Sequence, residues 1–297
     1  ARVTLIERDR MGGDCLNTGC VPSKALIRSA RIADYGRRAE EFGVHAGAVE
    51  VDFPRVMERV QEVVKTIEPH DSVERFTGLG VDCVQGEARI LSPWEVEVNG
   101  ERLAARNIVI ATGARPRIPD IDGLDQLDYL TSDSVWELRE SPGRLLVLGA
   151  GPIGCELAQA FARLGCRVTL ATHAGRVLPR EDPEVSEQVH QAFERQGIQV
   201  LLDHEPLRFT AGTESNCLFN TPDGSKEEQF DRLLLAVGRS PNVENLGLEE
   251  LGIGITRQGT VEVDEYLGTG IPGVYACGDV AGSYQFCLLA SPQAWYA

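Results

Sequence analysis

The chain has 297 residues, 42% hydrophobic and 25% charged, which is enough to bury cores in two or more domains. Its formal net charge of −16 argues against nucleic acid and against anionic membranes as partners. The longest mostly apolar run, residues 145–154, is too short to cross a bilayer. No basic-then-apolar leader opens the chain, and its eight cysteines are neither dense nor evenly spaced, so we expect a reducing cytoplasm.

The chain opens on a predicted buried strand, residues 2–8, in which Glu7 comes near the end. An acid at that point of a strand suits hydrogen bonding to a ribose hydroxyl pair. A surface acid with no ligand is the alternative.

Two cysteines follow, Cys15 and Cys20, separated by four residues. Asn17 and Gly19 tolerate positive φ, which favours a tight turn and a small disulfide loop. The next residues predict a helix, so Cys20 lies near a helix N-terminus where a thiolate is favoured, and Lys24 adds positive charge. We favour a redox-active pair over a structural disulfide or half a zinc site, because zinc pairs usually have shorter spacing and need a second pair. The other six cysteines fall in or beside apolar segments and are expected to pack as small hydrophobes.

Local patterns predict the elements between these motifs. They indicate a helix over 54–67, a strand with a turn over 81–90, a hairpin over 94–103 with Asn-Gly at its bend, and a buried strand over 108–111. Later in the chain they indicate a helix over 183–196, a strand over 200–202, a polar hairpin turning at 222–224, and strands over 233–237 and 273–281.

Two stretches recur in the same order. Residues 2–5 (Arg-Val-Thr-Leu) return at 167–170, and residues 108–116 have a counterpart at 233–241. The recurrence predicts two copies of one α/β unit. The first copy carries additional residues between its landmarks, and the cysteine segment with the helices after it is the obvious insertion.

The second copy contains a dinucleotide-binding pattern. A buried strand over 145–148 runs into Gly149-Ala150-Gly151-Pro152-Ile153-Gly154, followed by a helix over 155–164 and a strand from residue 167. Such glycines let the backbone approach a pyrophosphate at the helix N-terminus. A tight glycine turn without a ligand is the alternative. The matching motif of the first copy would fall before residue 1, so we expect this chain to lack that copy's first strand, glycine loop and helix.

Five motifs in order resemble the flavoprotein disulfide reductases, a family that includes glutathione reductase, dihydrolipoamide dehydrogenase and mercuric reductase. They are Cys-x-Asn-x-Gly-Cys-Val-Pro-Ser-Lys (15–24), Ala-Thr-Gly (111–113), Gly-x-Gly-x-x-Gly-x-Glu (149–156), Gly-Arg-x-Pro-Asn (238–242) and Gly-Asp (278–279). Residues 156–182 are most similar to mercuric reductase.

The resemblance implies an α/β fold of two Rossmann-like, three-layer domains. Residues 1–120 would bind FAD, 121–242 would bind NAD(P), and 243–297 would return to the FAD or central domain. The FAD domain is thus interrupted by the NAD(P) domain. The C-terminal dimerisation domain of the family is expected to be absent.

The resemblance also implies a two-electron relay from NAD(P)H through FAD to a Cys15–Cys20 disulfide and on to a small-molecule, disulfide or metal-ion substrate. Cys20 would be the sulfur nearer the flavin, and Cys15 would exchange with substrate. Lys24 would lie near the flavin and pair with Glu156. These four residues form the expected catalytic set, with no bound metal ion.

Further residues are expected to contact the cofactors. For FAD they are Glu7, Gly13, Lys24, Gly86, Ala88, Ala111, Thr112, Gly113, Arg239 and Asp279. For NAD(P) they are Gly149, Gly151, Ile153, Gly154, Glu156, Thr172, His173, Arg176 and Gly238. The second-domain strand ends without an acid, while His173 and Arg176 are available for a 2′-phosphate, so NADP is favoured over NAD.

In this family a His-Glu pair from the partner subunit completes the site, so the resemblance implies a homodimer. All five histidines of this chain precede the matching region. We therefore expect the chain as given to be inactive alone and to hold FAD weakly. The competing hypothesis is a non-catalytic dinucleotide-binding module, free of flavin, in which the cysteines are structural or regulatory.

Overall fold

The computed structural model describes residues 2–212, 214–282 and 286–296. The chain divides into two compact units. The first contains Ala1–Gly12, Pro69–Arg115 and Arg239–Ala297, and the second contains Gly13–Glu68 and Pro116–Gly238. The helical segment that carries the two cysteines is thus grouped with the glycine motif. The assignment of cofactors to domains 1–120, 121–242 and 243–297 stays a prediction.

The second unit is built on a four-stranded parallel sheet in the order β10-β9-β8-β14. The strands are β8 (Arg144–Leu148), β9 (Arg167–Ala171), β10 (Gln199–Leu201) and β14 (Arg232–Leu235). Helix α5 (Pro152–Arg163) follows β8, and α6 (Pro183–Arg195) lies between β9 and β10 in sequence. Residues 145–148 are all buried, as a continuous apolar run in a parallel sheet predicts.

Between β10 and β14 the chain forms a three-stranded antiparallel sheet. Its strands are β11 (Glu205–Thr210), β12 (Ser215–Thr221) and β13 (Gly224–Phe230), in that order. The predicted turn at 222–224 joins β12 to β13 and is confirmed. Phe209 and Phe230 meet edge to face with ring centroids 6.1 Å apart, and together with the buried Phe219 they form the core of this sheet.

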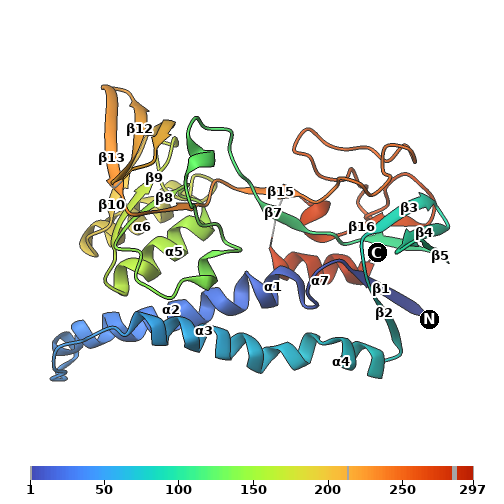
Figure 1. Ribbon diagram of the computed structural model, residues 1–297, viewed down its shortest axis with the longest axis horizontal. Coiled ribbons are helices and arrows are strands. Elements are labelled where there is room, and N and C mark those ends of the chain that lie inside the picture. The colour runs from blue at the N-terminus through green and yellow to red at the C-terminus, as the bar shows by residue number, and fades with distance from the viewer. Residues whose placement is uncertain (1, 213, 283–285, 297) are drawn as a thin grey trace. The chain divides into compact units, whose positions relative to one another are not determined.

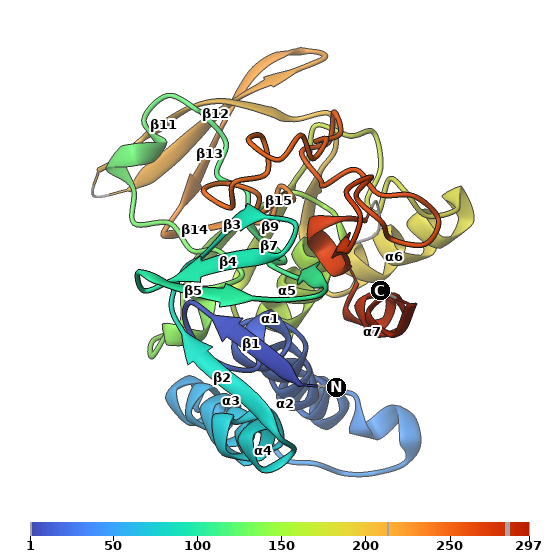
Figure 2. The same cartoon turned by 90° about the vertical axis from the view of Figure 1, so that its right-hand side faces the viewer.

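The helical segment of the second unit contains α1 (Gly13–Asn17), α2 (Cys20–Arg37), the short helix η1 (Ala39–Phe42) and α3 (Phe53–Ile67). Helices α2 and α3 lie side by side (Figures 1 and 2). Helix α3 begins at Phe53, one residue before the predicted start. The Asp52 side chain caps it by accepting a hydrogen bond from the backbone N–H of Arg55 at 3.0 Å, and proline occupies the first turn. The short helices η3 (Leu124–Gln126) and η4 (Val135–Glu137) precede the parallel sheet.

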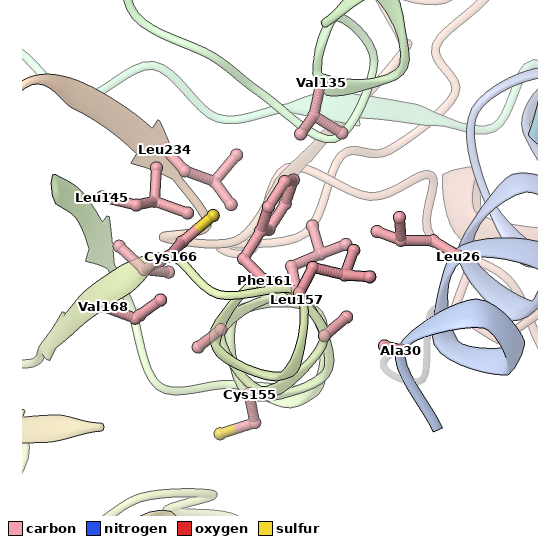
Figure 3. Close-up of a cluster of buried hydrophobic side chains, with 14 of the residues drawn as sticks. Leu26, Ala30, Val135, Leu145, Cys155, Leu157, Phe161, Cys166, Val168 and Leu234 are labelled. Carbon is pink, nitrogen blue, oxygen red and sulfur yellow. The ribbon is translucent and has the colours of Figure 1, made fainter. Parts of the chain in front are cut away.

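The main core joins α2 to the parallel sheet through α5. Leu26 and Ala30 of α2 point toward Leu157 and Phe161 of α5 (Figure 3). In the same view, Val135 of η4 lies beyond the Phe161 ring, on the side away from α5. Phe161 is fully buried and stacks on Phe53 of α3, with ring centroids 6.2 Å apart.

The first unit contains two parallel strand pairs and an antiparallel sheet. The pairs are β1 (Val3–Glu7) with β2 (Val81–Gln85) and β6 (Ile108–Ile110) with β16 (Val274–Ala276). These two pairs form two separate sheets, and no strand in the described ranges hydrogen bonds to both β1 and β6. The antiparallel strands are β3 (Ala88–Ser92), β4 (Glu95–Val98) and β5 (Glu101–Ala104), seen face-on in Figure 2.

The predicted hairpin of the first unit is confirmed. Asn99 and Gly100 have φ of 54° and 81°, which is the pair of positive values that a tight two-residue hairpin turn requires. A further ribbon pairs β7 (Ala114–Pro116) with β15 (Arg239–Pro241). The remaining elements are α4 (Val73–Gly78), α7 (Cys287–Tyr296) and the short helices η2 (Glu68–Asp71) and η5 (Gly278–Val280). Among the described residues, no helix has the length and apolar character needed to span a membrane.

Phe161→Ala tests the core between α2 and the sheet. Because the side chain is fully buried and stacked on Phe53, we expect the free energy of unfolding to fall by about 3–5 kcal/mol. Urea unfolding followed by circular dichroism measures this. The control is Val185→Ala on α6, where the side chain is 44% exposed and the loss should stay within about 0.5 kcal/mol. Equal losses in the two variants would contradict this account of the core.

Candidate functional site

The glycine motif forms the turn between β8 and α5. Gly149 has φ of 101°, and a Cβ on it would overlap the carbonyl oxygen of Ala236. A Cβ on Gly154 would overlap the carbonyl oxygen of Gly149, so this glycine is needed for close helix packing. Gly151 differs, because nothing in the described structure lies within 4 Å of the place where its Cβ would stand. The middle glycine therefore faces open space, as a backbone that admits a pyrophosphate requires.

Helix α5 begins directly at this turn. Gly151 is its N-cap and supplies no side-chain hydrogen bond, and Pro152 occupies the first turn. Ile153 and Gly154 follow and bring their backbone N–H groups to the positive end of the helix dipole. This arrangement suits an anionic group such as a pyrophosphate.

The cysteine segment folds as two helices joined by a tight turn. Cys15 lies in α1 and Cys20 is the first residue of α2, and both side chains are half-buried. The backbone N–H groups of Thr18 and Gly19 both donate to the Asp14 carbonyl, at 2.9 and 2.5 Å. A Cβ on Gly19 would lie 2.9 Å from that carbonyl oxygen, so the turn needs a residue without a side chain.

The expected reason for this turn is wrong in one detail. Positive φ was expected at Asn17 and Gly19, but neither residue has it. Asn17 is the last residue of α1, where its side-chain amide donates to the Gly13 carbonyl at 2.9 Å, and Gly19 has φ of −113°. The residues between α1 and α2 are held by hydrogen bonds to one carbonyl, that of Asp14, and Gly19 is needed for space.

An ion pair connects the cysteine segment to the glycine motif. Lys24 Nζ lies 2.8 and 3.0 Å from the two carboxylate oxygens of Glu156, which confirms the expected contact. Lys24 follows Cys20 by about one turn of α2, and Glu156 follows Gly154 in α5. The roles of both residues in catalysis stay predictions.

Two of the residues expected to contact FAD are neighbours near the ends of β1 and β2. The Glu7 side chain accepts from the backbone N–H of Asp9 at 2.9 Å, and the Glu7 carbonyl accepts from the N–H of Gly86 at 2.9 Å. A Cβ on Gly86 would overlap the Asn99 side chain. Ala88, also expected there, begins β3.

The Ala-Thr-Gly motif is fixed by a residue that sequence reasoning did not select. The Asn242 amide nitrogen donates to the Thr112 carbonyl at 2.9 Å, and its backbone N–H donates to the Gly113 carbonyl at 2.9 Å. The Thr112 hydroxyl donates in turn to the Asn242 carbonyl at 2.6 Å. Ala111 precedes this clasp, and Gly113 has φ of 68°. The signal was available, because Asn242 ends the Gly-Arg-x-Pro-Asn motif.

Arg239 and Asp279 contact each other. The Arg239 Nε lies 3.5 Å from an Asp279 carboxylate oxygen, and the side chains are 12% and 19% exposed. Arg239 also donates to the Ala114 carbonyl. The guanidinium group therefore orients the Asp279 carboxylate. Asp279 is the second residue of η5.

The residues expected at the adenosine end of NAD(P) surround the end of β9. Thr172 is buried and its hydroxyl accepts from the N–H of Ala174 at 3.2 Å, so it shapes the local turn. His173 is exposed and lines a shallow depression of about 360 Å³. Arg176 donates to the carbonyls of residues 179 and 181, at 2.9 and 3.3 Å. Gly238, with φ of 116°, accepts from the backbone N–H of residue 117 at 3.0 Å.

The other cysteines within the described side chains pack as expected. Cys155, Cys166, Cys217 and Cys277 are buried, and Cys83 is half-buried. Burial raises the pKa of the Cys155 and Cys217 thiols to about 12, and it also raises the pKa of Cys166 and Cys277. Thiols with such pKa values remain protonated near neutral pH and are poor nucleophiles. The predicted side-chain packing of Cys287 lies outside the described side chains.

A parallel sheet, a glycine turn open at its middle glycine, and a cysteine pair in the same unit are typical of α/β dinucleotide-binding proteins that carry out redox chemistry. Comparison with known families agrees with this class. The chain belongs to the pyridine nucleotide-disulphide oxidoreductase family, whose pattern matches residues 1–294. The predicted membership of this family and the predicted α/β fold are confirmed.

Individual relatives span both named branches of the expected resemblance. The chain is 36% identical over 292 residues to a mercuric reductase of Lysinibacillus sphaericus, covering 98% of this chain and 54% of the relative. It is 34% identical over 300 residues to a dihydrolipoyl dehydrogenase of Chlamydia pneumoniae, covering 98% and 63%. Among solved structures, a Cu(II) complex of the HOCl-induced flavoprotein disulfide reductase RclA from Escherichia coli matches with a TM-score of 0.85, 29% identity and coverage of 98% and 63%. The chain thus spans between about half and two thirds of these relatives.

Alanine at two glycines should separate folding from binding. Gly151→Ala adds a methyl group into open space, so we expect stability to change by no more than about 0.5 kcal/mol while dinucleotide binding weakens about tenfold or more. Gly154→Ala forces a methyl group onto the Gly149 carbonyl, so unfolding should be easier by about 1–3 kcal/mol. Thermal unfolding and NADPH titration calorimetry measure both. A Gly151→Ala protein that binds as tightly as the parent would rule out this loop as the pyrophosphate site.

Proposed function

We propose that this chain carries the dinucleotide-dependent half of a disulfide reductase, in which NAD(P)H reduces a Cys15–Cys20 disulfide that then reduces substrate. The observation that carries the proposal is the Lys24–Glu156 ion pair, because it connects the helix headed by Cys20 to the helix headed by the glycine turn. Family membership supports the same conclusion. We also propose a homodimer, as the family resemblance implies, and a cytoplasmic location, as the sparse and unevenly spaced cysteines predict.

In this proposal the redox step balances within the protein and its cofactors. Opening the S–S bond consumes the two electrons of one NAD(P)H and one further proton, and it yields two thiols and NAD(P)⁺. FAD, when bound, supplies the two-electron carrier between nicotinamide and disulfide. Glu7, Gly86, Thr112 and Asp279 of the first unit are among the residues proposed to hold it.

In this proposal the residues of the second unit stabilise the charge on Cys20 and fix the position of the Lys24 ammonium. The α2 N-terminus and Lys24 stabilise a thiolate at Cys20, and Glu156 holds the Lys24 ammonium in place. Cys15 then exchanges with substrate. Both a disulfide and a soft metal ion react with thiolates, so the proposed substrates are of these two classes.

For the nucleotide we propose NADPH. Arg176 uses two carbonyl contacts, and a guanidinium group has five N–H donors, so donors remain for a 2′-phosphate. Asp203 and Glu205 line the same depression as His173 and oppose an anion there. The proposed preference for NADPH therefore depends on Arg176.

Cys20→Ser should separate a redox enzyme from a passive binding module. In the full-length protein reduced with NADPH, we expect the long-wavelength absorption band between thiolate and flavin to vanish while FAD stays bound. Cys83→Ser is the matched control, because Cys83 is equally half-buried but lies in β2, and it should keep the band. A band retained in Cys20→Ser would refute the assignment, and a parent protein without any band would favour the passive module.

Arg176→Ala tests the nucleotide preference. Losing a charged hydrogen bond to the 2′-phosphate should lower kcat/KM for NADPH about tenfold or more, with little change for NADH. Steady-state kinetics with both nucleotides measure this. Arg180→Ala removes the same charge from an exposed position of the same loop and should leave the ratio unchanged. A parent enzyme with kcat/KM for NADH at least about tenfold higher would overturn the proposal for NADPH.

A further inference from the structure

A buried tryptophan contacts the turn between the two cysteines. Trp136 lies in η4, 118 residues after Thr18 in sequence, and is 4% exposed. Its indole Nε1–H donates to the Thr18 carbonyl at 2.9 Å and to the Ser132 carbonyl at 2.6 Å. Both residues belong to the second unit. An indole group has only one N–H donor, so this hydrogen bond is shared between two acceptors.

The contact fixes one peptide group at both ends. The Thr18–Gly19 peptide presents its carbonyl to the Trp136 indole and its N–H to the Asp14 carbonyl. Rotation of this peptide would break both hydrogen bonds at once. Since the next residue is Cys20, the peptide orientation decides how the first turn of α2 leaves the loop.

Trp136 is itself held firmly. Its backbone carbonyl accepts from the Gln61 side chain of α3 at 3.2 Å and from Arg139 at 3.1 Å. Its neighbour Val135 is fully buried against the core that contains Phe161 (Figure 3). The indole group is therefore a rigid support for the turn.

We propose that Trp136 is a positioning residue for the Cys15–Cys20 pair, and that its indole N–H shifts the thiol–disulfide equilibrium toward the disulfide. The inference rests on the redox role proposed above. A turn that is already fixed loses fewer conformations when the S–S bond closes, so closure costs less entropy. Without the N–H the reduced turn gains freedom and the dithiol is favoured.

Trp136→Phe in the full-length protein tests this, because it keeps an aromatic ring in the core and removes the donor. The protein is equilibrated in mixtures of reduced and oxidised dithiothreitol, then alkylated, and the Cys15–Cys20 peptides are quantified by mass spectrometry. The exchange balances, because one disulfide is opened for each dithiothreitol oxidised. We expect the equilibrium constant for disulfide formation to fall about fivefold, as loss of one hydrogen bond predicts.

Two further proteins make the result specific. Trp94→Phe is the matched control, since Trp94 is 54% exposed in the first unit and its loss should leave the equilibrium constant unchanged. If Trp136→Phe fails to fold, a tryptophan analogue with sulfur in place of the indole N–H is placed at position 136. This analogue keeps the shape of the side chain and should give the same fivefold shift.

The outcomes separate the inference from the proposed function. A parent protein whose two cysteines do not interconvert with dithiothreitol contradicts the redox role itself. A parent pair that does interconvert, with an unchanged equilibrium constant in the position-136 proteins, overturns only the role of Trp136. The role of Trp136 is also overturned if Trp136→Phe lowers the melting temperature and leaves the equilibrium constant as it was, because that result describes a packing role.

Discussion

The packing of α2 against α5 is the constraint on which the rest of the second unit depends. At one end of the contact Lys24 pairs with Glu156, and at the other Arg163 lies 3.8 Å from Asp34. Both helices therefore run in the same direction. Lys24 and Glu156 each come four residues after the start of their helix, so each N-terminus lies only about 6 Å along its axis from the ion pair. The Cys20 turn and the glycine turn are thus held at the same end of one core.

The ion pair is not what holds these helices together. Its side chains are 60% and 44% exposed, and an exposed pair contributes about 0–1 kcal/mol. Burial of a side chain such as Phe161 or Leu26 contributes about 1.5–3 kcal/mol each. The packing sets the distance between α2 and α5. At that distance the Glu156 carboxylate fixes the direction of the Lys24 ammonium. The fixed direction of the Lys24 ammonium therefore matters more for its action on nearby groups than for the stability of the fold.

Local signals predicted much of the fold. The strand, glycine turn and helix over 144–163 could be read because an apolar run, three glycines and a helical pattern follow each other directly. The hairpin at Asn99-Gly100 was equally local. Strand β11 was missed, because it contains Pro206, most of its side chains are half-buried or exposed, and only Phe209 is buried. Leu207 and Phe209 do alternate with polar residues, but over four positions directly after Pro206, and so short a run gives only a weak periodic signal.

The long-range contacts at the site were not readable from local patterns. Trp136 and Thr18 are 118 residues apart, and Asn242 and Thr112 are 130 apart. Each pair joins a side-chain donor to a backbone carbonyl, and every residue has such a carbonyl, so residue type does not identify the partner. The Lys24–Glu156 contact could be expected only from the resemblance to a family, since two charged residues 132 positions apart are otherwise indistinguishable from solvated ones.

Because α2 and α5 are parallel, their positive N-termini lie close together and repel each other. Two positive helix ends of about half a charge each, some 9 Å apart, repel by about 0.5 kcal/mol at an effective dielectric constant near 20. The burial of Phe161 alone exceeds that repulsion. An anion at either end gains about 0.3–1 kcal/mol from its own helix and also relieves part of the repulsion from the other. Under the proposed function both anions exist, a pyrophosphate at α5 and a thiolate at α2. The hydrophobic core therefore holds the two positive ends together, and an anion at either end offsets part of the repulsion between them.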